Sequence, residues 1–320
     1  MKILIASSIY PEAIERLQEE HDVICAFNAT EEMLKETIAD REVLIFRSGV
    51  RITGDVMASA PNLKLLIRAG CGLDNIDMDW VRKRRLQLVR IPEPAAKAVS
   101  EMAFALMLAL SRNLLQADHL TRQGRWAKRE FSSGYLLTGK MLGIIGAGNI
   151  GSRTGQLGAA WGMDVIGCVE FPTLVIARQL RDKGIQLTSC DEVLARADFL
   201  CVHVPLAEST RHLINADAIA RMKPGAFLIN LARGGVVDEE ALREALVRGH
   251  LRGAALDVHA DEGEGMVSPL ADLPNVILTP HIGSGTIDSQ REIGERVIEI
   301  IQAFLAEQSE AVLEVEQAVA

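Results

Sequence analysis

The chain has 320 residues, of which 48% are hydrophobic and 24% are charged, and its formal net charge is −9 at pH 7. This length is enough for two hydrophobic cores, and the composition is that of an ordinary globular protein. The acidic balance, without a sustained block of Lys and Arg, argues against a nucleic-acid or membrane-surface partner. A function on small molecules is therefore the better expectation.

Membrane insertion, export and metal binding are also disfavoured. The longest apolar run, Met102 to Leu110, is about half of what a bilayer crossing needs, so it predicts a buried helix. No export signal is evident, because Pro11 and acidic residues follow the short apolar start of the chain. The five cysteines are scattered, with neither a Cys-x-x-Cys pair nor a His spaced for zinc. We expect reduced thiols, no metal and a cytoplasmic location.

The first 94 residues have the pattern of a small α/β sheet. Compact apolar runs at residues 2–7, 42–48 and 63–70 predict strands, and residues 11–20 predict a helix that begins at a proline. The two prolines of the segment at 91–97 interrupt regular structure and suit a crossing between domains.

A second α/β region follows. A long helix is expected at residues 98–120, then a polar stretch to Gly139. Six short runs rich in Ile, Val and Leu alternate with helical segments, which indicates a parallel, doubly wound sheet; they are KMLGIIGAG, MDVIGCV, DFLCVHVP, AFLINLAR, GAALDV and VILTPH. A last amphipathic helix, at about 289–307, could return to the first domain.

The glycines Gly146, Gly148 and Gly151 form a G-x-G-x-x-G pattern that follows a predicted strand and opens a predicted helix. This is the context that a dinucleotide pyrophosphate site requires. Gly146 would make the tight turn, Gly148 would let the backbone approach the pyrophosphate, and Gly151 would let the helix pack on the strand.

The next predicted strand should end in an acid that holds the ribose hydroxyls. Val169 ends the run and Glu170 follows it, so the acid is present, one residue late. We expect NAD in preference to NADP, although Arg178 could accommodate the 2′-phosphate of NADP.

Several motifs together resemble the D-isomer-specific 2-hydroxyacid dehydrogenases, most closely their phosphoglycerate dehydrogenase branch, and the likeness covers essentially the whole chain in the correct order. The motifs are NLARGGVVDEEAL, GAALDVHADEGEG, ILTPHIGSGT, RAGCGLDNID and FRSG. The resemblance implies a Rossmann dinucleotide domain at 95–286, nested within a flavodoxin-like substrate domain made of 1–94 and 287–320. It also implies an active site in the cleft between them, and a homodimer through the long helix and the arm that contains Trp126.

The expected reaction needs a cation for the substrate carboxylate, a base for the hydroxyl proton and a hydride acceptor. The guanidinium of Arg233 can donate two parallel hydrogen bonds to a carboxylate, in a bidentate arrangement, and His281 lies at a Thr-Pro-His turn. Glu262 can pair with His281 and stabilise the imidazolium form, which reduction of a keto acid needs as its proton donor. The family usually has Glu-Pro where this chain has Glu262 and Gly263, so Asp261 or Glu264 could take the role of Glu262.

The remaining cofactor contacts are implied by position. His203 is expected to border the cofactor without proton chemistry, and the other histidines have no supporting motif. By resemblance, the contacts lie near the pyrophosphate at Asn149 and Ile150, near the adenine at His203, Val204 and Pro205, and near the nicotinamide at Leu231, Ala232, Asp257, Gly283 and Ser284.

Arg47, Arg68, Gly70 and Cys71 are the expected substrate residues, with Cys71 where the family has threonine. Two cations beyond Arg233 favour a phosphorylated substrate. 3-Phosphoglycerate, oxidised to phosphohydroxypyruvate in serine biosynthesis, is the first expectation, and hydroxypyruvate or glyoxylate reduction is the alternative. A non-catalytic, corepressor-like dinucleotide sensor is the alternative of another class. No regulatory domain like that of longer relatives is expected after residue 320.

Overall fold

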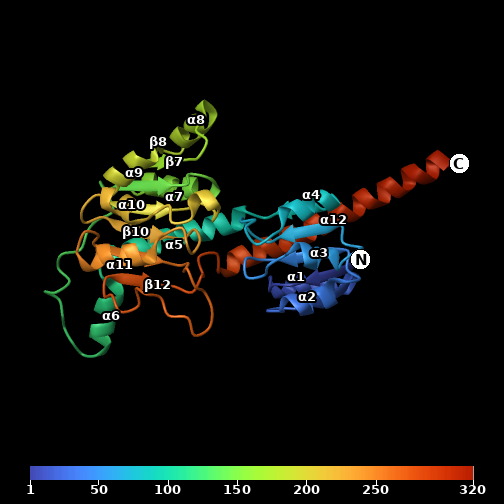
Figure 1. Ribbon diagram of the computed structural model, residues 1–320, viewed down its shortest axis with the longest axis horizontal. Helices are drawn as coiled ribbons and strands as arrows, with labels where there is room; N and C mark the ends of the chain where they lie inside the picture. Colours follow the sequence, from blue (N-terminus) through green and yellow to red (C-terminus); the bar gives the residue numbers. More distant parts are fainter. Residues whose placement is uncertain (320) are drawn as a thin grey trace. The chain divides into compact units, whose positions relative to one another are not determined.

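The computed structural model describes residues 1–319, with side chains as far as Gln308, and the chain divides into two compact units. The first unit combines Met1–Ala95 with the chain from Gly285 onward, and the second unit is Ala96–Ser284. Each unit is built on one parallel sheet (Figure 1). This confirms the predicted class, two α/β units with one inserted into the other.

The sheet of the first unit has five parallel strands in the order β2-β1-β3-β4-β5, the flavodoxin-like arrangement. Its elements in chain order are β1 (Lys2–Ile5), α1 (Pro11–Glu20), β2 (Asp22–Cys25), α2 (Glu31–Ile38), β3 (Val43–Phe46), α3 (Gly54–Ala58), β4 (Leu65–Arg68), α4 (Met78–Arg84), β5 (Gln87–Arg90) and, after the second unit, α12 (Ile287–Val319).

Side chains from alternate positions of these strands form two cores, one on each face of the sheet. Ile3 and Ile5 pack with Leu17 of α1 and with apolar residues of α12, such as Val297. Leu4 packs on the opposite face with residues of α2, α3 and α4. Segments from before and after the second unit are therefore parts of one folded unit.

The second unit has seven parallel strands in the order β12-β11-β10-β9-β6-β7-β8, the Rossmann arrangement with its order reversing at β6. Its elements are α5 (Glu93–Ser111), which begins in the first unit, α6 (Leu114–Arg122), β6 (Met141–Ile145), α7 (Asn149–Ala160), β7 (Asp164–Cys168), α8 (Leu174–Asp182), β8 (Gln186–Leu187), α9 (Cys190–Arg196), β9 (Phe199–Val202), the 3₁₀ turn Glu208–Thr210, α10 (Ala216–Arg221), β10 (Phe227–Asn230), α11 (Glu239–Val247), β11 (Gly253–Leu256) and β12 (Val276–Leu278).

Helices cover both faces of this second sheet as well. Residues of α9, α10 and α11 pack against Leu200 and Leu228 on one face, and residues of α5, α7 and α8 pack against Phe199 and Ile229 on the other. Because all the strands are parallel, the loops after β6, β7, β9, β10, β11 and β12 emerge at the same edge of the sheet. The candidate residues of this unit follow those strands.

The long helix was predicted at the wrong bounds. It begins at Glu93 rather than 98, because Pro94 lies in the first turn, where its missing N–H is not needed. It also ends at Ser111, and α6 begins at Leu114 after Asn113 takes a left-handed conformation with φ +50°. Asn tolerates that conformation better than most residues, so it breaks the helix without a glycine.

Three strands, β2, β5 and β8, were not predicted. They lie at the edges of the two sheets. Edge strands are only half covered, so β2 and β5 contain exposed polar residues and lack the continuous apolar run of a central strand. The strand β8 has only two residues.

Helix α5 is long and apolar enough to cross a membrane, the one such helix in the described part of the chain. In its most apolar window, however, 67% of the residues are buried within the protein. Val99, Phe104 and Met107 belong to the core of the second unit.

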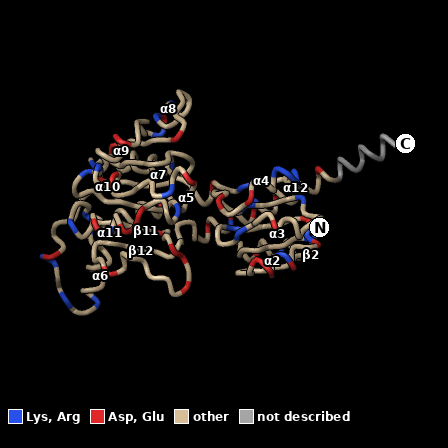
Figure 2. The backbone as a smooth tube through the Cα atoms, viewed as in Figure 1, with Lys and Arg blue, Asp and Glu red and all other residues tan. Residues whose placement is uncertain are grey.

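Figure 2 shows Lys and Arg interspersed with Asp and Glu along both units.

Replacing Leu200 by Ala should destabilise the protein by about 2–5 kcal/mol, because this fully buried side chain of β9 leaves a cavity. Leu174→Ala is the matched control, since Leu174 is 92% exposed, and it should change stability by less than about 0.5 kcal/mol. Urea denaturation measures both. Equal losses in the two variants would contradict the assigned core.

Candidate active site

Three adjacent strands of the second unit carry most of the candidate site. Asn230 of β10 pairs with Leu256 of β11, which pairs in turn with Leu278 of β12. The segments that follow these strands therefore emerge side by side. They contain Arg233, the loop with Glu262, and the turn with His281.

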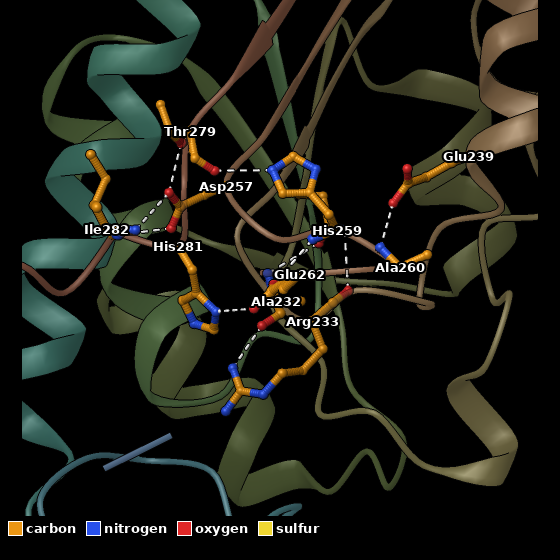
Figure 3. Close-up of polar contacts among 12 residues, drawn as sticks. Ala232, Arg233, Glu239, Asp257, His259, Ala260, Glu262, Thr279, His281 and Ile282 are labelled. Carbon is orange, nitrogen blue, oxygen red and sulfur yellow. Dashed lines mark hydrogen bonds and ion pairs between the residues drawn. The ribbon is translucent and has the colours of Figure 1, made fainter. Parts of the chain in front are cut away.

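Asp257 organises the turn after β12. It directly follows β11 and is 2% exposed. Its carboxylate accepts hydrogen bonds from the Thr279 hydroxyl at 2.6 Å, the Ile282 amide at 2.9 Å and the Gly283 amide at 2.7 Å (Figure 3). The buried charge is thus compensated by three donors from one short turn, and the turn is held to β11.

His281 occupies the centre of that turn in a left-handed conformation, with φ +54°. A residue with a Cβ atom rarely adopts this conformation. The amide of His281 donates to the carbonyl of Asp257 at 2.8 Å, and the Asp257 carboxylate holds residues on both sides of the histidine. These bonds stabilise the strained backbone that presents the imidazole.

Glu262 and His281 are in contact: Nδ1 of His281 lies 2.9 Å from a carboxylate oxygen of Glu262. Partial burial opposes the charge of Glu262, yet the hydrogen bond and the nearby charge of His281 hold its pKa below its ordinary value. A carboxylate only accepts hydrogen bonds, so Nδ1 carries a proton in either state of the ring. The nitrogen that can gain or lose a proton is therefore Nε2.

The guanidinium of Arg233 is held near the same edge. Its Nη1 donates to the carbonyl of Ala232 at 2.7 Å. The side chain of Asn230 accepts from the Ala232 amide at 3.1 Å and donates to the Arg233 carbonyl at 3.3 Å, which fixes the intervening turn. Figure 3 shows Arg233, Glu262 and His281 gathered in one cluster.

Two side chains of this cluster were missed by sequence reasoning. His259, which has no motif of its own, donates from Nε2 to the Thr279 carbonyl at 3.0 Å, and its backbone amide donates to Glu262 at 3.1 Å. Glu239 accepts from the Ala260 amide at 2.7 Å. The position of His259 between Asp257 and Glu262 was a usable signal, whereas no local pattern points to Glu239. In the described part of the chain, no hydrogen bond or ion pair joins the other candidate carboxylates, Asp261 and Glu264, to His281.

The glycine loop has the geometry of a dinucleotide cradle. The amides of Gly146 and Ala147 donate to the Cys168 carbonyl at 3.1 and 3.0 Å, which fixes the loop to the end of β7. A Cβ atom on Gly151 would lie 2.2 Å from the Gly146 carbonyl oxygen, whereas one on Gly148 would meet nothing within 4 Å. The loop thus leaves open space at the N-terminus of α7, where the first amides of a helix have no intrahelical acceptor. Asn149 begins that helix, and Ile150 packs on the core.

The segment after β9 packs directly on this loop. A Cβ atom on Gly146 would lie 2.8 Å from the carbonyl of His203 and from the side chain of Val204. Burial lowers the pKa of His203 to about 4, so its ring is neutral near pH 7. Its Nε2 lies 3.3 Å from the Thr154 hydroxyl, and Pro205 is exposed at the end of the segment.

The candidate ribose residues lie at the end of β7. Val169 is packed against the core of the second unit, and Glu170 is exposed. Glu170 is therefore the carboxylate available to solvent at this point of the chain. Arg178 is an exposed residue of α8.

The candidate nicotinamide residues come from two neighbouring strand ends and the turn after β12. A Cβ atom on Gly283 would lie 2.8 Å from the Asp257 carboxylate and 3.4 Å from the Leu231 side chain. Leu231 and Ala232 are buried, and Ser284 is partly buried.

The candidate substrate residues of the first unit lie at the ends of the adjacent strands β3 and β4, where Phe46 pairs with Arg68. Arg68 is 3% exposed, and its Nε donates to the Gly72 carbonyl at 3.0 Å. A Cβ atom on Gly70 would lie 2.5 Å from the Arg68 guanidinium. Burial lowers the pKa of Arg47, which is partly exposed, although an arginine remains charged. The Cys71 thiol donates to the Pro92 carbonyl at 3.2 Å.

No group of three or more His, Cys, Asp or Glu side chains in the described residues is placed to hold a metal ion. The second unit instead brings a hydrogen-bonded His–Glu pair and a guanidinium to the sheet that carries the glycine loop. Such a set can serve hydride transfer to or from a bound dinucleotide.

Comparison with known proteins gives matches over almost the whole chain. Residues 104–283 match the family model described as D-isomer specific 2-hydroxyacid dehydrogenase, NAD binding domain. The chain is 40% identical to D-3-phosphoglycerate dehydrogenase of Methanocaldococcus jannaschii over 306 residues, 95% of this chain but 57% of that relative. The chain thus spans little more than half the length of that relative.

Two further matches extend over almost the whole length of the similar proteins. Hydroxypyruvate reductase of Thermotoga maritima is 38% identical over 286 residues, which are 89% of this chain and 91% of the relative. The crystal structure of D-lactate dehydrogenase from Aquifex aeolicus, complexed with NAD and lactic acid, superposes with a TM-score of 0.83. It is 30% identical, and the match covers 97% of each chain.

Gly148→Ala should leave the free energy of unfolding nearly unchanged, because the new methyl group meets open space, but it should weaken NADH binding about 10-fold or more by filling that space. Gly151→Ala, in contrast, should lower the free energy of unfolding by about 1–3 kcal/mol, because the Gly146 carbonyl must move to make room for the new methyl group. Thermal unfolding and titration calorimetry measure the two effects. Unchanged NADH affinity in Gly148→Ala would contradict the proposed cradle.

Proposed function

Because this chain belongs to the D-isomer specific 2-hydroxyacid dehydrogenase family, we propose that it transfers a hydride between NAD(H) and a small D-2-hydroxy acid or 2-keto acid. The observation that carries the proposal is the 2.9 Å contact between His281 and Glu262, which leaves Nε2 of the imidazole for proton transfer. Glu262 and His281 lie in the segments after β11 and β12, which are strands of the sheet whose β6 leads into the glycine loop.

Each side chain has a distinct task in the reduction direction. A dinucleotide held by the loop of Gly146, Gly148 and Gly151 would supply the hydride to the keto carbon. Nε2 of the His281 imidazolium donates a proton to the carbonyl oxygen, and it takes that proton back when the hydroxy acid is oxidised. Arg233 binds the carboxylate of the substrate through its guanidinium. The pKa of Glu262 is held below its ordinary value, so its side chain is a carboxylate that stabilises the imidazolium form of His281.

We propose 3-phosphoglycerate and phosphohydroxypyruvate as the first substrate pair. The D-3-phosphoglycerate dehydrogenase of M. jannaschii is the relative with 40% identity, and Arg47 and Arg68 at adjacent strand ends supply positive charge for a phosphate. Hydroxypyruvate reduction is the second candidate, because the T. maritima reductase matches this chain over 91% of its own length. The burial of Arg68 and its bond to the Gly72 carbonyl support this second candidate, because they are consistent with a structural role for that arginine instead of phosphate binding.

We further propose that NAD is preferred over NADP. Glu170 is exposed directly after β7, where a carboxylate accepts hydrogen bonds from the ribose hydroxyls and repels a 2′-phosphate.

A homodimer through the second unit is also proposed. The segment from α6 to Gly139 leaves large apolar side chains exposed: Leu114 by 56%, Trp126 by 83% and Leu136 by 71%. Such apolar exposure on one segment is typical of an interaction surface. Sedimentation equilibrium of the purified chain tests this proposal.

His281→Ala should lower turnover of 2-keto acids by about 100- to 10,000-fold, because the general acid is lost, while NADH binding changes little. His21→Ala, at the C-terminal end of α1 in the first unit, is the control and should retain turnover. Unaltered turnover in His281→Ala would exclude the proposed role.

Glu262→Gln should move the alkaline fall-off of keto-acid reduction to lower pH. The neutral amide no longer stabilises the imidazolium, so the proton donor is lost at a lower pH than in the wild type. The pH profile of kcat with saturating NADH measures this shift. Asp261→Asn is the matched control, and a shift in that variant instead would assign the role to Asp261.

A panel of phosphohydroxypyruvate, hydroxypyruvate and glyoxylate with NADH and NADPH tests activity, substrate and cofactor together. Under the first proposal, kcat/KM is highest with phosphohydroxypyruvate and NADH. Arg47→Ala should then lower kcat/KM for phosphohydroxypyruvate by about 10- to 150-fold and leave glyoxylate nearly unaffected. Equal efficiency of the wild type with hydroxypyruvate and its phosphorylated form would favour the reductase.

A further inference from the structure

The loop that carries Glu262, residues 258–268, is anchored at its start by Val258, which is 1% exposed, and has little apolar anchoring after it. All the residues from Asp261 to Val267 are exposed, including Val267 at 80%. Gly263 and Gly265 have φ of +144° and +80°, in the region that favours glycine. A loop with two such glycines and few buried apolar contacts moves readily. The position of Glu262 must therefore depend on polar contacts.

Glu239 provides those contacts at both ends of the loop. Its side chain lies in the first turn of α11 and is 7% exposed. Oε1 accepts from the Ala260 amide at 2.7 Å, and Oε2 lies 3.4 Å from the Ser268 hydroxyl, which donates to it. Figure 3 shows the carboxylate of Glu239 reaching Ala260. One buried carboxylate thus joins the two ends of the loop.

The helix behind Glu239 is a rigid support. Asp238 caps α11 by accepting from the Ala241 amide at 3.1 Å, and Leu242 and Leu246 are buried in the core. One turn after Glu239, Arg243 donates to the Pro269 carbonyl at 2.7 Å and pairs with Asp272. The segment that follows the loop is therefore attached to the same helix.

The contact at Ala260 lies two residues before Glu262. Here the loop closes on itself, because the His259 amide, directly before Ala260, donates at 3.1 Å to the Glu262 oxygen that does not contact His281. Fixing Ala260 therefore fixes the stretch from which Glu262 reaches His281. The titratable groups that act on Glu262 are His281 and His259.

We propose that Glu239 is a positioning residue, which holds the loop of residues 258–268 so that Glu262 meets Nδ1 of His281. This inference rests on the proposed function, since it deepens the role given to the Glu262–His281 pair. A Gln at this position keeps an acceptor for the Ala260 amide and can donate to the Ser268 oxygen, whereas an Ala removes both contacts.

Kinetics of three variants test the role in the reaction. Glu239→Ala should lower kcat for keto-acid reduction on the order of 10- to 100-fold and move its alkaline fall-off to lower pH, as Glu262→Gln does. Glu239→Gln should restore both towards the wild type. Glu240→Ala, an exposed neighbour in the same helical turn, is the matched control and should change neither.

A double-mutant cycle separates positioning from a general loss of structure. If Glu239 acts through Glu262, Glu239→Ala should lower kcat by less than about 2-fold in the Glu262→Gln background. An equal loss in both backgrounds, or a pH profile that does not move, would overturn the proposal.

Hydrogen exchange gives a readout that does not need turnover. In Glu239→Ala, peptides covering 258–268 should exchange faster, with those of β10 and β11 unchanged, and Glu239→Gln should remain protected. Faster exchange in a protein that reduces no 2-keto acid would reject the proposed function but support the role of Glu239 in holding the loop. Unchanged exchange in the peptides covering 258–268 would reject that role.

Discussion

The candidate site depends on the buried carboxylate of Asp257. It accepts from one hydroxyl and two amides of the turn after β12, so a charge with 2% exposure is fully engaged by a single short segment. Loss of a partner for such a group is costly, because the charge cannot be solvated by water instead. The same bonds hold His281 at a positive φ that a residue with a Cβ atom rarely adopts.

A second constraint connects the Arg233 turn with the loop of residues 258–268. A Cβ atom on Gly234 would lie 1.7 Å from the His259 carbonyl oxygen, so the two backbones are in direct contact. The chain then continues from this turn into α11, whose first residue is Glu239. The cation, the carboxylate and the helix that supports the loop are thus parts of one packed assembly at the end of β10 and β11.

The features that were predictable from the sequence depend on local patterns. Central strands are continuous apolar runs because both their faces are buried, and the glycine loop is readable because each glycine has its own steric reason. The edge strands, the break at Asn113 and the buried partner of the loop were not predictable. Each depends on the surrounding fold. An edge strand is defined by having one neighbouring strand, the break at Asn113 is a left-handed turn that one Asn makes, and Glu239 contacts Ala260, which is 21 residues away in the sequence.

The three adjacent strands that carry Arg233, Glu262 and His281 have an evolutionary consequence. The hydrogen bonds that orient Asp257, Glu262 and His281 are made within the second unit, whereas Arg47 and Arg68 belong to a separately packed sheet. Mutations can therefore accumulate in the first unit without disturbing the bonds that orient Glu262 and His281. Under the roles proposed above for these residues and for Arg47 and Arg68, reaction and specificity can be inherited separately.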